Sequence, residues 1–276
     1  MTPIHGIEIL NPFQLGSLRI FIAGLVLMPV ALRHLKILRN KHSITLLFVG
    51  LTGNLIPAFL FPLAETEIQS SLAGLLNMGT SVFIIIISWV FFKDKINRIQ
   101  FFGFCLGALG LSLILAKQID SSENNFFYAL YVILATVFYA TSLSLIKYKL
   151  QHLKAVVITS LAFFLMFIPA TISCFYTGAF QAIEFSEPGL RSIGYLLVLS
   201  VLGTAVAVLL FNHLVAISTP LFTSSVTYIM PIIALFLGVL DGEFFDPINL
   251  IWILLIFSGV YFMSKKKQKT VKNPSV

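Results

Sequence analysis

The residues of this sequence that could do chemistry are polar side chains placed inside long apolar runs. Arg19 is the only formal charge well inside such a run, and a guanidinium there could balance an anionic or zwitterionic substrate. Arg19 also lies only about five residues from the N-terminal end of its run, which is the outer end in the topology given below. Its side chain could therefore instead reach toward the membrane surface and pair with an acid there. The sequence leaves both hypotheses open.

Amides and hydroxyls form further polar stripes at helical spacing, in both halves of the chain. Plain helix packing produces such stripes as readily as substrate contact does, but their convergence from two halves favours a shared cavity. We therefore predict that the substrate-binding residues are Arg19, Asn54, Asn77, Thr80, Tyr139 and Tyr228. His213 is a candidate proton carrier, because histidine titrates near neutral pH; the alternative is an interfacial residue that carries no proton.

The composition excludes an ordinary soluble enzyme. Of the 276 residues 58% are hydrophobic and only 11% are charged, against roughly 25% charged in soluble domains, and the mean hydropathy is +0.97. No known catalytic motif is present, so we predict no catalytic residue, no cofactor and no metal site. Cys105 and Cys174 lie inside apolar runs, where we expect two small buried hydrophobic side chains.

The hydropathy pattern predicts an all-α polytopic membrane protein with nine transmembrane helices, since one span needs roughly 20 apolar residues. Ser218, Thr219 and Pro220 break an apolar run that is too long for one helix. The predicted spans are 14–32, 44–63, 70–92, 101–116, 126–146, 155–176, 192–215, 222–240 and 248–263.

The basic residues sort to one side of this nine-span arrangement. All but three of the 18 Lys and Arg residues fall in loops 33–43, 93–100 and 147–154 and in the tail 264–276; the other three are Arg19, Lys117 and Arg191. Because basic loops mark the cytoplasmic side, we predict a multi-pass protein of the inner membrane with a cytoplasmic C-terminus. The net charge of +7 is explained by topology, so no nucleic-acid partner is predicted.

The chain contains a weak internal repeat. A shift of 149 residues places Ala58 on Ala207 and Gly110 on Gly259, and a shift of 140 places Pro29 on Pro169. The partner of span 126–146 would lie mostly before Met1. The pattern therefore predicts two five-helix repeats, the first one without its first helix. Either the chain has lost this helix or its true start lies further upstream, and we favour the second interpretation. A repeat with an odd number of spans is inverted, which is typical of secondary transporters.

Three segments resemble a known family. Residues 70–83 resemble the fourth helix of EamA-type members of the drug/metabolite transporter superfamily, and 228–243, with Pro231 and Glu243, resemble their ninth. Leu18, Arg19 and Ala23 resemble the start of their second helix. Thr80 and Ser81 stand where the family usually shows a proline, and Asp94 stands where a Glu is common.

The resemblance implies an organisation and a function. The domains would be a truncated first EamA repeat (1–116), a second repeat (126–263) and a basic cytoplasmic tail (264–276). The protein would be a permease, often an exporter, that moves a small metabolite or amphipathic organic solute by alternating access. Its partners would be this small-molecule substrate and the lipid bilayer, and a homodimer stays open. A polytopic transferase and a non-transporting assembly partner are the alternative functions.

Overall fold

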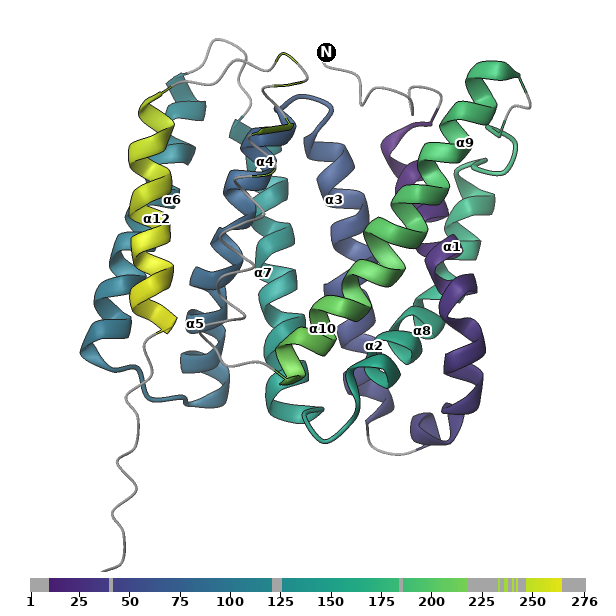
Figure 1. The fold of residues 1–276 in the computed structure, drawn as a ribbon, viewed down its shortest axis with the longest axis horizontal. Coiled ribbons are helices and arrows are strands. Elements are labelled where there is room, and N and C mark those ends of the chain that lie inside the picture. Colours follow the sequence, from purple (N-terminus) through teal and green to yellow (C-terminus); the bar gives the residue numbers. More distant parts are fainter. Residues whose placement is uncertain are drawn as a thin grey trace, which may run out of the picture.

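The computed structural model describes residues 10–39, 42–120, 126–183, 186–217 and 247–264, with five isolated positions between 217 and 247. These residues form a bundle of helices, and no strand occurs among them (Figure 1). Seven helical segments in these ranges are long and apolar enough to cross a membrane, and a shorter apolar helix covers Leu250–Phe262. The prediction of an all-α membrane protein is therefore confirmed at this level. The predicted span 222–240 and the break at 218–220 lie outside the described residues, so the nine-helix count stays a prediction.

The helices follow the predicted spans with small shifts at their ends. Three spans are composite, because a π-helical segment or a turn interrupts them. In chain order the elements are α1 (Pro12–Arg33), the 3₁₀ turn η1 (Leu35–Arg39), α2 (Ser43–Gly50), the π-helical η2 (Leu51–Leu55), α3 (Ile56–Ala64), α4 (Ser70–Asn77), α5 (Gly79–Phe92), α6 (Arg98–Asp120), α7 (Phe126–Lys149), α8 (Ala155–Tyr176), α9 (Glu187–Ser200), the π-helical η3 (Val201–Val206), α10 (Ala207–Ile217) and α12 (Ile248–Ser264).

Helix α1 packs antiparallel against α8. Its first turn is closed by a capping box between Asn11 and Gln14, which satisfies backbone N–H groups that have no partner within the helix. The Gln14 side chain also donates to the backbone carbonyl of Thr177, 3.0 Å away. One turn further, the hydroxyls of Ser17 and Ser173 lie 2.7 Å apart. These contacts hold α1 in a fixed register, which positions the Arg19 side chain two residues later.

Helices α6 and α12 stand side by side at one edge of the bundle (Figure 1). Glycines let the two backbones approach closely, as in membrane helix pairs with the small-xxx-small pattern. A Cβ added to Gly259 would lie 2.5 Å from the backbone nitrogen of Gly107, and one added to Gly110 would lie 2.9 Å from the carbonyl oxygen of Trp252. The order of these contacts shows that the two helices run antiparallel.

The loops that carry most basic residues meet at one end of the bundle, here called the basic end. The rings of His42 and His152 are 4.7 Å apart, and the Lys147 ammonium lies 3.9 Å from the Asp94 carboxylate. Since α12 runs antiparallel to α6, it also ends there. The described parts of loop 33–43, loops 93–97 and 150–154 and the end of α12 at Ser264 thus share one end, as the charge pattern predicts.

Helix α7 packs against α2, η2, α3, α4 and α5. Gly53 of η2 makes this possible, because an added Cβ would collide with the hydroxyl oxygen of Ser142 on α7. One turn before Ser142, the ring of Tyr139 lies 5.9 Å from that of Phe61 on α3. This packing turns Tyr139 toward η2 and α1.

Candidate functional site: a polar cavity around Arg19

A small cavity with a polar lining lies where α1, η2, α3, α7, η3 and α10 meet. Its volume is about 20 Å³, which is room for roughly one water molecule. Pockets for organic ligands are usually some 300–1,000 Å³, so this conformation encloses the cavity too tightly for an organic solute. The lining residues are Arg19, Ile20, Gly53, Asn54, Ala58, Tyr139, Thr204 and Val208.

The Arg19 side chain is held in this cavity by a hydrogen bond. Its Nε donates to the Oγ1 of Thr204 at 2.6 Å, and Thr204 donates in turn to the carbonyl of Leu199 at 2.9 Å. Thr204 is buried and Arg19 partly buried. The guanidinium is thus tied to a helical segment that is distant in sequence.

Both π-helical segments contribute to the cavity. In η2 the cause is Pro57, which has no N–H and whose ring clashes with the carbonyl four residues earlier, at Gly53. In η3 the Thr204 hydroxyl donates to the carbonyl of Leu199, five residues earlier, and so inserts a side chain among the backbone hydrogen bonds of the helix. The wider turns present Asn54 and Thr204 toward Arg19. Single π-helical turns occur often at functional sites.

The structure brings together three of the predicted site residues, Arg19, Asn54 and Tyr139. Thr204 was missed, because a threonine in an apolar run has no distinctive pattern. One signal was available: the 149-residue shift places Leu55, the neighbour of Asn54, on Thr204.

Asn77 and Thr80 do not line this cavity. They lie at the break between α4 and α5, where the Thr80 hydroxyl is 3.3 Å from the Asn77 carbonyl oxygen. His213 is exposed on α10, whereas its neighbour Asn212 is buried and donates to Thr159 at 2.8 Å. The last predicted site residue, Tyr228, lies outside the described residues.

The expectation of two buried cysteines is wrong for one of them. Cys174 is buried, but Cys105 is exposed. The reason is the direction of the α6 glycines: Gly103 and Gly107 face α12, and a residue two positions from each points to the opposite side of the helix. In a membrane protein that side faces lipid, where a thiol is tolerated as a small apolar group.

A second polar cluster, at the basic end, joins the ends of α5 and α7. The Tyr148 hydroxyl donates to the Asp94 carboxylate at 2.5 Å and accepts a hydrogen bond from Lys147 at 3.0 Å. The Tyr148 ring stacks on that of Phe92 at 4.3 Å. Between these residues Lys93 ends α5 in a left-handed conformation, with φ of +53°. The cluster thus joins the first predicted repeat to the second at the basic end.

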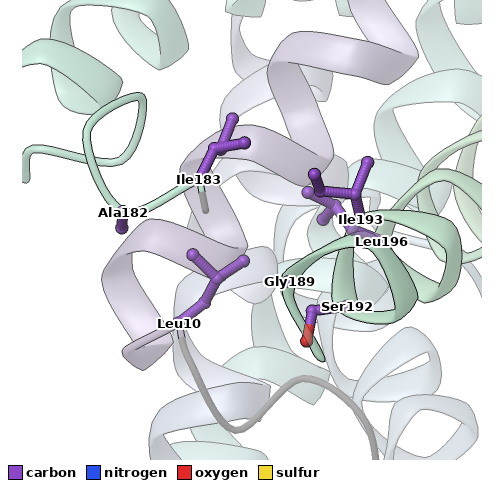
Figure 2. Close-up of a pocket in the computed structure, with 7 residues that line it drawn as sticks. All are labelled: Leu10, Ala182, Ile183, Gly189, Ser192, Ile193 and Leu196. Atoms are coloured by element: carbon purple, nitrogen blue, oxygen red, sulfur yellow. The ribbon is translucent and has the colours of Figure 1, made fainter. Parts of the chain in front are cut away.

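A further pocket lies at the end opposite the basic end, between α9 and the segments around Leu10 and Ile183 (Figure 2). Its volume is about 10 Å³, at the lower limit of the roughly 10–15 Å³ that one water molecule needs. The hydroxyl of Ser192 is the one polar side-chain group that Figure 2 shows among the lining residues. This pocket is a packing gap and adds no candidate site.

Comparisons with known proteins agree with this architecture. The EamA-like transporter family matches residues 5–116 and 126–265. The chain is 25% identical over 274 residues to the uncharacterized transporter YetK of Bacillus subtilis, covering 95% of this chain and 81% of that protein. It is 23% identical over 274 residues to an uncharacterized transporter of Clostridium kluyveri, covering 95% and 87%. A crystal structure titled only as a protein shares the fold, with a TM-score of 0.61, 16% identity and coverage of 92% and 88%.

The helical bundle, its apolar spans and these matches define a multi-pass membrane transporter. The chain belongs to the EamA-like transporter family.

Proposed function

We propose that this protein is a secondary transporter that moves a small organic solute by alternating access, with the cavity around Arg19 as its binding site. The observation that carries this proposal is that both predicted repeats line the cavity. Arg19 and Asn54 come from the first repeat, and Tyr139 and Thr204 from the second. In transporters built from inverted repeats, the substrate site lies at such an interface near the middle of the membrane.

Pairs of equivalent helices support the inverted repeat. Helices α1 and α8, equivalent under the 140-residue shift, pack antiparallel, and so do α6 and α12 under the 149-residue shift. The π-helical segments η2 and η3 also overlap under the 149-residue shift. An inverted repeat requires equivalent helices to run in opposite directions, and these pairs do.

In this mechanism the two halves rock around the cavity, and one end opens while the other stays closed. The Asp94–Tyr148–Lys147 cluster could close the cavity toward the basic end. Opening would break only a few hydrogen bonds, and water can replace them at little net cost. We further propose that the basic end faces the cytoplasm across the inner membrane, from the positive-inside rule. His213 stays a candidate for proton coupling, on the exposed side of α10.

The test is a flux assay on purified protein in liposomes. The liposomes are loaded with a defined mixture of amino acids, organic acids, sugars, nucleosides and quaternary amines, and efflux is followed by mass spectrometry. We expect one chemical class to leave faster than from protein-free liposomes. Gly53→Val should abolish this flux, because its side chain would fill the cavity and strike Ser142, whereas Gly194→Ala, where an added Cβ meets no described atom within 4 Å, should not. Equal efflux with and without protein would contradict the proposal.

A further inference from the structure

We infer that the cavity around Arg19 recognises a carboxylate, and that the substrate is an organic acid with a small apolar body. This inference rests on the proposed function, since it names the substrate class of the same site. Its starting point is the position of the Arg19 charge. Arg19 follows the first residue of α1 by seven positions, which is roughly 10 Å along the helix axis, and its Nε is fixed to Thr204 on η3.

Among the described residues, no acidic side chain lines the cavity beside this charge. The eleven Asp and Glu residues all fall near or beyond the ends of the apolar runs, and residues 192–240 contain none. The described residues that line the cavity include no carboxylate. A charge within a membrane span is costly unless it is paired. A carboxylate on a solute that enters the cavity would supply the negative charge that the described lining lacks.

The other cavity groups fit an acceptor-rich ligand. The Thr204 hydroxyl is already used, since it accepts from Arg19 and donates to Leu199. The groups that remain are the guanidinium NH₂ pair of Arg19, the amide of Asn54 and the hydroxyl of Tyr139, and all of these can donate. A guanidinium fork binds a planar carboxylate through two parallel hydrogen bonds.

The apolar residues of the cavity lining narrow the substrate class further. Ile20, Ala58 and Val208 give the cavity an apolar wall, which suits an aliphatic or aromatic body on the ligand. No lining residue in the described part of the chain supplies a negative charge for an ammonium group, and Arg19 repels cations. The site thus favours simple organic anions over zwitterions and over quaternary amines.

The test compares probes of nearly the same shape, one with a carboxylate and the other with an uncharged amide. Acetate, butyrate, hexanoate and benzoate are each paired with the corresponding amide, and binding to the full-length protein in nanodiscs is measured by the shift of its thermal unfolding midpoint. The variants are Arg19→Gln, Arg19→Lys and, as a matched loss of one positive charge, Arg191→Gln, since Arg191 is exposed on α9. The same probes are then followed in the liposome flux assay.

We expect at least one carboxylate to bind and its amide not to bind. Arg19→Gln should weaken that binding by roughly tenfold or more, because a hydrogen-bonded charge partner is lost; Arg19→Lys should lose less, and Arg191→Gln nothing. Equal binding of a carboxylate and its amide, equal binding to wild type and Arg19→Gln, or no binding of any carboxylate overturns the inference. Because the wild-type comparison of acid and amide needs no variant, poor folding of Arg19→Gln leaves the test intact.

The two proposals fail in different ways. If the wild-type protein moves a neutral or cationic solute and no carboxylate, alternating-access transport stands and the carboxylate inference is wrong. If carboxylates bind in an Arg19-dependent manner and no solute crosses the liposome membrane, the site assignment stands and the transport proposal is wrong.

Discussion

Replacing Gly259 by alanine tests the close packing of α12 against α6. The added Cβ would lie 2.5 Å from the nitrogen and 2.8 Å from the Cα of Gly107, and 2.6 Å from the carbonyl oxygen of Gly103. All three atoms belong to backbone and cannot turn away. To reach ordinary carbon contacts of about 3.5 Å, the helices must separate by roughly 1 Å at this point.

The expected loss of stability follows from two opposing effects. Overpacking of this kind costs about 1–3 kcal/mol, and alanine gains about 0.5–1 kcal/mol over glycine within a helix. We therefore expect Gly259→Ala to lower the free energy of unfolding by about 1 kcal/mol, and by about 2.5 kcal/mol at most. The measurement is the thermal unfolding midpoint of purified protein in a mild detergent.

Gly194→Ala is the control, because it is the same substitution in a helix without the close contact. Gly194 is exposed on α9, and no described atom lies within 4 Å of its added Cβ. This variant should be unchanged, or more stable by about 0.5–1 kcal/mol. If Gly259→Ala were as stable as Gly194→Ala, the two helices would not pack through their glycines and the reasoning would be refuted.

Three further predictions concern the basic end, a buried hydrogen bond and the topology. Tyr148→Phe should keep the ring and remove the hydroxyl bonds, so a cysteine introduced in the cavity should react faster with a water-soluble maleimide; an unchanged rate would argue against a closure there. Asn212→Leu and Thr159→Val should each cost about 1 kcal/mol or less, and the double variant should cost less than their sum in thermal unfolding, since one hydrogen bond joins them; strict additivity would contradict this. A cysteine at Ser186 should be labelled from outside intact cells and one at Ser264 should not; the reverse pattern would invert the orientation.

The sequence was sufficient for the features that depend on local composition. The long apolar runs of 14–32 or 155–176 predict membrane spans because each backbone polar group in lipid must be satisfied within its own helix, and the helices begin and end within a few residues of these limits. Arg19 stands out for the same reason, as a charge where lipid tolerates none. The basic loops predict a shared end of the bundle, which the contact between Lys147 and Asp94 illustrates.

Only the tertiary structure decided which polar stripes meet. In the sequence Asn54, Asn77 and Tyr139 are equivalent candidates, because each lies in an apolar run at helical spacing. The turn of η2 and the close approach of Gly53 to α7 bring Asn54 and Tyr139 to Arg19, while Asn77 stays at the break between α4 and α5. Thr204 joins them through a π-helical turn that no local pattern in 201–206 predicts. Helical periodicity predicts on which face of its own helix a residue lies. The points where helices cross and the π-helical turns decide which residues of other helices that face contacts.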